Sequence, residues 1–268
     1  MRRRLGQALR VGVGDSSLTL LKTSRWFGPA QTLMAGLPLA RGNSPSAVAE
    51  ALRQLLHGGT YAGWPVTLVL DEALVRLWHV TPPPGSARRA DLEAAAALRF
   101  ELLYGEPSAD WKLSAAWDAR RPFLAAAIAR PMLAAFEQVA REERLALVEV
   151  VPQFVAGWNR WHGALRDDAW FALLQEQVLT LGAPRDGALA SVRSVLLPEG
   201  AAPGWLAAHL AREALLLDLP APARLQVCAG ALGPLKRCAD GVDCTLLGPE
   251  AEAGSSAGAR LAATGSRA

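Results

Sequence analysis

The feature that most constrains the fold is a pair of apolar runs joined by a tight turn near the start of the chain. Residues 11–13 and 18–21 are the two runs, and the turn between them, residues 14–17, reads Gly-Asp-Ser-Ser. Glycine, aspartate and serine favour tight turns, so the stretch predicts a β-hairpin. Such a turn either simply reverses the chain or presents its backbone N–H groups to a phosphate. The choice between a scaffold and an enzyme depends on which of the two it does.

Composition sets the scale of the fold and excludes one class of partner. The chain has 268 residues, of which 51% are hydrophobic and 20% charged, enough for a large core in one large domain or two small ones. Its net charge is only +3, and its one basic run is residues 2–4. Aromatic residues do not alternate with basic ones, as a nucleic-acid stacking surface requires. We therefore expect no nucleic-acid partner.

Targeting signals and metal motifs are missing from the sequence. No stretch reaches the ~18 uninterrupted apolar residues that span a bilayer, and no small-residue cleavage site follows residues 2–4. The three cysteines, Cys228, Cys238 and Cys244, include no Cys-x-x-Cys pair and have no histidine nearby. The sequence thus predicts a cytoplasmic chain without a metal site.

The order of predicted elements indicates an α/β fold built from two related halves. Each half begins with a hairpin and a third strand, followed by a helix and a further strand. The first half, residues 1–152, carries an inserted subdomain at about residues 60–130. The second half, residues 153–247, is expected to be truncated. Alanine, glycine, serine and glutamate dominate residues 248–268, which predicts a disordered tail.

Several segments in this order resemble the actin-like ATPase superfamily. They are Val-Gly-Val-Gly-Asp-Ser-Ser-Leu at 11–18, Leu-Asp-Glu-Ala-Leu-Val-Arg at 70–76, Thr-Pro-Pro at 81–83, residues 123–130 leading into a helix at Pro131, and the strand at 145–152. The likeness covers roughly residues 10 to 230 and is strongest to the pilus-assembly PilM branch, which is related to FtsA and to the cytoplasmic domain of GspL from type II secretion. It implies a duplicated, ribonuclease H-like actin fold.

The resemblance also defines a candidate nucleotide site, which is degenerate. Nucleotide-binding members carry Asp-x-Gly-Ser/Thr at the first turn, where the acid positions a hydrated metal ion and the turn holds phosphate. Here Gly12 stands in the place of that acid, and Asp15 stands where a small hydroxyl residue is usual. A carboxylate inside the turn repels phosphate. The corresponding turn of the second half, residues 173–177, contains no glycine.

We therefore expect no catalytic residue and no cofactor, with weak ATP binding left open. The degenerate phosphate turn consists of Gly12, Gly14, Asp15, Ser16 and Ser17. The alternative is an ATP-binding actin-like ATPase whose acid lies elsewhere on the first hairpin.

The resemblance implies a partner as well as a fold. In PilM-like proteins a short segment of a membrane-anchored partner docks in a groove between the first subdomain and the inserted one. Transferred to this sequence, the candidate partner-binding residues are Arg76, Trp78, Leu98, Arg99 and Phe100. Two other interpretations stay open: the tryptophan belongs to the core, and Arg99 forms an ordinary intramolecular salt bridge.

The expected function is that of a non-catalytic cytoplasmic scaffold at the inner face of the inner membrane. It would belong to the assembly platform of a type IV pilus or type II secretion system and bind the cytoplasmic segment of a bitopic inner-membrane protein, with an assembly ATPase as a further candidate partner. A GspL-type secretion cytoplasmic domain is the other alternative.

Overall fold

The computed structural model divides the chain into two compact units. It describes residues 5–26, 28–40, 42, 44–85, 88–228, 235, 237–248 and 256–266. The first unit comprises Met1–Ala156 and Gly258–Ala268, and the second comprises Gly157–Ala257. The units divide shortly after Pro152, where the sequence placed the start of the second half. The first unit is completed by a segment from the far end of the chain.

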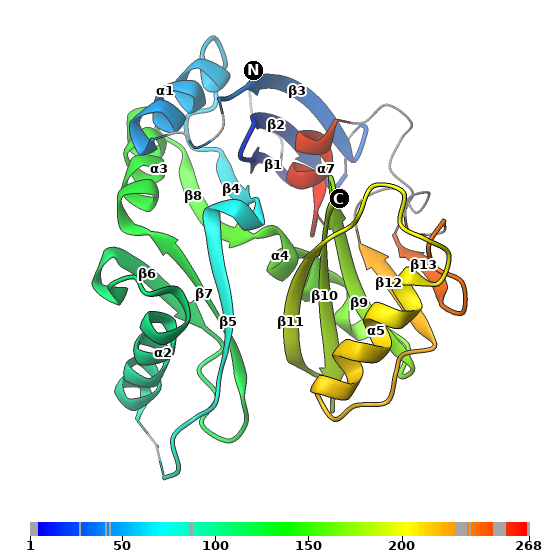
Figure 1. The fold of residues 1–268 in the computed structure, drawn as a ribbon. Helices are drawn as coiled ribbons and strands as arrows, with labels where there is room; N and C mark the ends of the chain where they lie inside the picture. The colour runs from blue at the N-terminus through cyan, green and yellow to red at the C-terminus, as the bar shows by residue number, and fades with distance from the viewer. Residues whose placement is uncertain are drawn as a thin grey trace. The chain divides into compact units, whose positions relative to one another are not determined.

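A five-stranded mixed sheet forms the body of the first unit, with strand order β3-β2-β1-β4-β8. An antiparallel meander supplies three strands: β1 (Gln7–Val13), β2 (Ser17–Ser24) and β3 (Gln31–Pro38). β4 (Pro65–Leu70) pairs parallel to β1, and β8 (Ala146–Pro152) pairs parallel to β4. The hairpin expected from the opening turn is therefore the start of this sheet (Figure 1).

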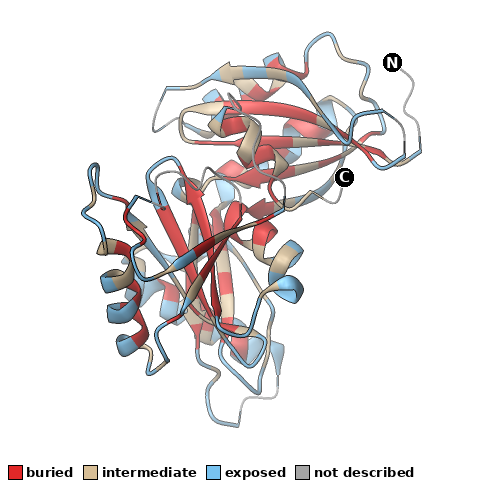
Figure 2. Cartoon of the chain, turned by 90° about the vertical axis from the view of Figure 1, so that its right-hand side faces the viewer, coloured by how far each residue is buried: buried red, intermediate tan, exposed pale blue. Residues whose placement is uncertain are grey.

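Helices α1 (Pro45–Leu56) and α3 (Arg130–Glu142) pack against one face of this sheet. That face of β1 is formed by Leu9, Val11 and Val13, which alternate along the strand and are fully buried. In Figure 2 the buried residues follow the central strands, while the helices expose one side to solvent. Residues of even number on β1 point to the opposite face, which matters for the candidate site.

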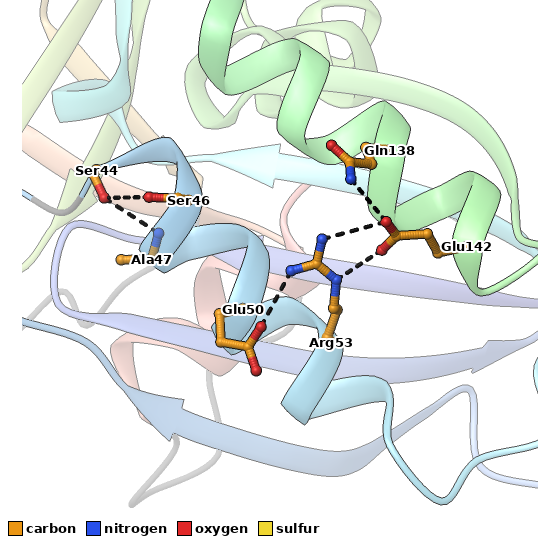
Figure 3. Close-up of polar contacts among 7 residues, drawn as sticks. All are labelled: Ser44, Ser46, Ala47, Glu50, Arg53, Gln138 and Glu142. Carbon is orange, nitrogen blue, oxygen red and sulfur yellow. Dashed lines mark hydrogen bonds and ion pairs between the residues drawn. The ribbon is translucent and has the colours of Figure 1, made fainter.

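Polar contacts fix the start of α1 and join it to α3 (Figure 3). Ser44 caps α1 by accepting a hydrogen bond from the backbone N–H of Ala47 at 3.3 Å, and Pro45 opens the helix, a pairing that favours a helix start. Arg53 of α1 donates from Nε to Glu142 Oε2 of α3 at 2.7 Å. Exposed ion pairs of this kind contribute little stability, so the apolar faces of the two helices hold them together.

The inserted subdomain lies between β4 and α3. A short 3-10 turn, η1 (Glu72–Leu74), leads into β5 (Val75–Val80), α2 (Arg89–Tyr104), η2 (Ser108–Asp110), β6 (Trp111–Ala115) and β7 (Phe123–Ala129). The strands form an antiparallel sheet of order β5-β7-β6. α2 contributes Leu92, Ala96 and Phe100 to the core of this subdomain, at the four-residue spacing that places side chains on one helix face.

The second unit repeats the sheet of the first. α4 (Gln153–Trp161) contains the boundary between the units, and the short η3 (His162–Ala164) follows it. The strands are β9 (Ala169–Gln175), β10 (Val178–Arg185), β11 (Ala188–Leu196), β12 (Arg224–Cys228) and β13 (Asp243–Leu247), in the order β11-β10-β9-β12-β13. α5 (Trp205–Leu216) covers one face. The same sequence of antiparallel meander and parallel strands confirms a duplicated α/β fold.

Two features near the C-terminus differ from the prediction. The order expected for each half contains four strands, whereas the second sheet has β13 as a fifth. This unit is therefore shorter because it lacks an insert and not because it lacks a strand. The prediction of a disordered tail over residues 248–268 was wrong for α7 (Ala257–Ala263), which is helical. Leu261 and Ala262 are fully buried in the first unit, and tertiary contact of this kind overrides a low-complexity composition.

Candidate functional site

The β1–β2 turn closes as an ordinary tight hairpin. The backbone N–H of Gly14 donates to the carbonyl of Ser17 at 2.8 Å, so this group is used within the turn. The carboxylate of Asp15 accepts a hydrogen bond from the backbone N–H of Gly42 at 3.2 Å, in the connection between β3 and α1. Asp15 therefore links two loops, and its carboxyl group lies beside the backbone that would hold a phosphate.

The opposite side of β1 is covered by α7 at the position of Gly12. A Cβ atom added at Gly12 would lie 2.7 Å from the carbonyl oxygen of Gly258 and 2.8 Å from the backbone nitrogen of Ala262. Real Cβ contacts below 3.0 Å essentially never occur, so any side chain at this position requires α7 to move. Figure 1 shows α7 (red) beside β1 and β2 (blue).

These residues do not fit a bound Mg²⁺–nucleotide. The resemblance places the metal-positioning acid at residue 12, where α7 leaves no room for a side chain. Among the described residues no group of three or more histidine, cysteine, aspartate or glutamate side chains is arranged to hold a metal ion. All three cysteines are buried, and none of them forms a disulfide.

The equivalent turn of the second unit joins β9 to β10 without glycine. Glu176 adopts a left-handed backbone conformation there, with φ of 51°, to make the two-residue reversal between Gln175 and Val178. Gln175 is buried and donates from its side-chain amide to the carbonyl of Ala257 at 3.3 Å. The Gln175 side chain beside this turn is thus hydrogen-bonded within the protein, and the sequence of the turn contains no phosphate motif.

The predicted partner residues Trp78 and Phe100 form the aromatic core of the inserted subdomain. Trp78 is 4% exposed and Phe100 is fully buried, and their rings meet edge-on with centroids 5.2 Å apart. Tyr104 and Trp111 complete the cluster, with ring centroids 5.1 and 5.4 Å from that of Phe100. Trp78 and Phe100 were predicted to contact a partner; in the structure the four-residue spacing along α2 and the pleat of β5 turn both side chains inward.

Arg76 supports this aromatic core from its edge. Its guanidinium carbon lies 5.2 Å from the centre of the Trp111 ring and 5.6 Å from that of Tyr104, which gives cation–π contact with both. Glu106 pairs with Arg76 at 3.5 Å and accepts a hydrogen bond from the Trp111 indole N–H at 3.0 Å. Arg76 is therefore held by internal contacts.

The outer face of α2 is apolar and exposed. Leu98 and Leu102, four residues apart on the same side of the helix, are 61% and 71% exposed. Between them in sequence, Arg99 is exposed and makes no hydrogen bond or ion pair with any residue that the structure describes. Leu98 and Arg99 thus remain available to a partner, and Leu102, which the sequence reading did not single out, joins them.

Glu72, a half-buried acid just after β4, contacts the start of α4. Glu72 Oε1 accepts a hydrogen bond from the backbone N–H of Phe154 at 2.8 Å, so this carboxylate caps the N-terminus of α4. Burial raises the pKa of Glu72 to about 7; the hydrogen bond from Phe154 opposes the shift and the nearby Asp71 adds to it. Glu72 therefore changes charge near neutral pH.

In the parts of the chain that the structure describes, no helix is both long enough and apolar enough to span a bilayer.

Comparison with solved structures identifies the class of fold. No protein-family model matches the sequence, and no curated protein matches it. A Bacteroides thetaiotaomicron protein of unknown function with an actin-like ATPase fold aligns over 90% of this chain and 91% of its own, with a TM-score of 0.62 and 8% identity. This likeness, together with the repeated sheet order, shows that the chain has the actin-like fold.

Two further structures with this fold come from a type IV pilus biogenesis complex and from a type II secretion system. The PilM–PilN type IV pilus biogenesis complex aligns over 91% of this chain and 89% of the matched one, with a TM-score of 0.61 and 17% identity. The cytoplasmic domain of EpsL, an inner-membrane component of the Vibrio cholerae type II secretion system, aligns over 95% of this chain and 92% of its own, with a TM-score of 0.56 and 14% identity.

Proposed function

We propose that the protein is a non-catalytic actin-like scaffold on the cytoplasmic side of an inner-membrane assembly platform of the type IV pilus or type II secretion kind. The fold that it shares with the EpsL cytoplasmic domain and with the PilM–PilN complex supports this assignment. Both alignments include the great majority of each chain, so the comparison extends to the inserted subdomain as well as to the two repeated sheets.

The observation that carries the non-catalytic part of the proposal is the packing at Gly12. Catalysis of phosphoryl transfer depends on positioned metal ions and backbone groups around the phosphates. Here α7 fills the space that a side chain at residue 12 needs, and Asp15 adds a carboxylate to the turn. Such a site disfavours a phosphate and has no acid at the position that the resemblance assigns to the metal-positioning residue, so we assign the function to the protein surface.

We assign partner binding to the outer face of α2, formed by Leu98, Arg99 and Leu102. The two leucines expose apolar surface. Burying it against a partner would stabilise the complex by about 25 cal/mol for each Å² removed from water. Arg99 has no counter-ion among the residues that the structure describes, so a carboxylate on the partner would gain a charge-assisted hydrogen bond. The partner proposed is a cytoplasmic segment of a membrane-anchored protein that carries apolar side chains and an acidic residue.

Site-specific photo-crosslinking tests this assignment. A photoreactive amino acid at position 102 of the full chain is expected to crosslink a membrane-anchored protein from detergent-solubilised membranes of the source cells. Arg99→Glu in the same chain is expected to lower the crosslinking yield about tenfold, since it replaces an attraction with a repulsion. The fold should be unaffected, because both side chains are exposed.

Position 215 provides the matched control. Leu215 of α5 is 82% exposed, so it offers a similar apolar side chain on a different surface. Equal yields of the same product at positions 102 and 215 would contradict the assignment to α2. Crosslinking at position 102 to soluble enzymes alone would contradict the assembly-platform role.

A further inference from the structure

The outer strand of the first sheet, β3, is an open edge beside β2 (Figure 1). It pairs with β2 along one side, and no other strand that the structure describes pairs with it. Alternate residues of an edge strand direct their N–H and C=O groups away from the sheet, where these groups can pair with another strand. Every residue of β3 is at least partly exposed, so solvent reaches this edge along its whole length.

β3 differs from every other edge strand that the structure describes in having no charged residue. Edge strands commonly carry a charge, which opposes pairing with another chain. The three sheets end in six strands, and five of them follow this rule. Their charged residues are Glu149 in β8, Arg76 in β5, Lys112 in β6, Arg193 in β11 and Asp243 in β13. β3 reads Gln-Thr-Leu-Met-Ala-Gly-Leu-Pro and therefore lacks this protection.

Exposed apolar side chains lie on β3 and next to it. Leu33 and Met34 of β3 are 60% and 37% exposed. Trp26, in the connection from β2 to β3, is 61% exposed, and Leu5, just before β1, is 74% exposed. The Trp26 ring lies over Gly6, where an added Cβ would be 2.9 Å from it, so Trp26 and Leu5 are found at the same end of the sheet. A group of exposed apolar side chains marks a surface for contact with another protein.

A bulge and a proline limit how far this edge can pair. The register between β2 and β3 shifts so that Met34 has no partner on β2, and this extra residue bends the strand. Pro38, at the end of β3, has no N–H to donate to a further strand. The regular stretches on either side of Met34 are short, so we expect a strand added here to bind reversibly.

The distribution of charge favours a second copy of the chain in antiparallel orientation. Two-fold symmetry brings the same strand of both copies together, and an uncharged strand then meets no like charge. Arg25 is exposed in the β2–β3 connection, at the Gln31 end of the strand. An antiparallel pair of strands of eight residues keeps the two copies of Arg25 about 25 Å apart, well beyond the Debye length. A parallel pair would bring them side by side.

We propose that β3 is a self-association site, at which two copies of the chain join their first sheets edge to edge as an antiparallel pair. Pairing uses the uncharged edge of both copies, so the association stops at a dimer. It also removes apolar surface of Leu33 and Met34 from water, which stabilises the dimer. The inference concerns the first unit alone and does not depend on the partner proposed for α2.

Analytical ultracentrifugation of the full-length protein tests the proposal. The unaltered protein is expected to pass reversibly from monomer to dimer between about 1 and 100 µM, the affinity of a small interface. Leu33→Lys is expected to raise the dissociation constant about tenfold or more, because each copy then brings a charge to the shared edge. Its side chain is mostly exposed, so the fold should be unaffected.

Leu196→Lys is the matched control for this substitution. Leu196 lies on the edge strand β11 and is 63% exposed, so the change of side chain and the exposure are nearly the same. The control is expected to dimerise like the unaltered protein. A protein that stays monomeric up to about 100 µM, or equal weakening of the dimer by both substitutions, would overturn the proposal.

Hydrogen exchange read by mass spectrometry locates the contact in the unaltered protein. Raising its concentration from about 1 to 100 µM is expected to slow exchange of the β3 amides and to leave those of β11 unchanged. Slower exchange elsewhere, with none in β3, would contradict the proposal by placing the dimer contact on another surface. Slower exchange in β3 only after detergent-solubilised membranes are added would also contradict it, since the strand would then pair with an extended segment of another protein.

Discussion

Phe100→Ala is expected to lower the free energy of unfolding of the inserted subdomain by about 3–5 kcal/mol, the range for removing a fully buried phenylalanine. Phe100 has no exposed surface, and its ring contacts those of Trp78, Tyr104 and Trp111. The substitution removes the centre of a four-ring cluster and leaves a cavity among the three remaining rings. A subdomain of this size is only marginally stable, so we expect it to unfold before the rest of the protein.

Urea unfolding followed by tryptophan fluorescence measures this effect, because two of the contacting rings are tryptophans. Leu98→Ala is the matched control, since Leu98 lies on the same helix and is 61% exposed. We expect this control to change the unfolding free energy by less than about 0.5 kcal/mol. Equal stability of the two variants would mean that Phe100 is not part of the core, and would restore it as a candidate partner residue.

Glu72→Gln is expected to stabilise the protein at pH 8 by about 1–3 kcal/mol and to remove one source of pH dependence. The pKa of Glu72 is raised from 4.5 to about 7 in the folded state, mainly by burial. When the pH lies between 4.5 and about 7, Glu72 is protonated in the folded protein but ionised in the unfolded chain. The free energy of unfolding therefore falls as pH rises through this window, and the loss is complete above pH 7. Glutamine keeps an oxygen that can accept the Phe154 N–H without carrying charge.

Thermal or urea unfolding between pH 4 and pH 8 tests this prediction. The difference in stability between Glu72→Gln and the unaltered protein should grow as pH rises and then level off. Glu137→Gln provides the control, since Glu137 is exposed on α3. A constant difference across the range, or the same trend in the control, would show that Glu72 does not cause the effect.

The hairpin and the repeated order of strands were predictable because their signals are local. The turn at residues 14–17 and the Ser44–Pro45 helix start depend on backbone preferences of the residues themselves. β13 and α7 depend instead on partners far away in sequence. α7 is largely alanine and glycine, so its composition resembles a flexible tail, and only its contacts with β1 and β4 make it a stable helix.

The candidate site was predictable at the turn but not on α2. Replacement of an acid by Gly12 is visible in the sequence once the motif is aligned, whereas the reason, the approach of Gly258, requires the structure. On α2 the sequence reading grouped Leu98, Arg99 and Phe100 because they are adjacent. Consecutive helical residues point about 100° apart, so Phe100 faces the core while Leu98 faces solvent. Counting by four from Leu92 identifies the buried face, and counting by four from Leu98 identifies Leu102.

Isothermal titration calorimetry of the full-length protein with Mg²⁺–ATP tests the central claim. That claim is that the β1–β2 turn forms the hairpin of the actin-like fold but does not bind a Mg²⁺–nucleotide. The account predicts no heat of binding at nucleotide concentrations up to about 1 mM, a limit that corresponds to roughly 4 kcal/mol of binding free energy. It also predicts no release of phosphate. Binding with a sub-millimolar dissociation constant, or measurable hydrolysis, would contradict the non-catalytic assignment.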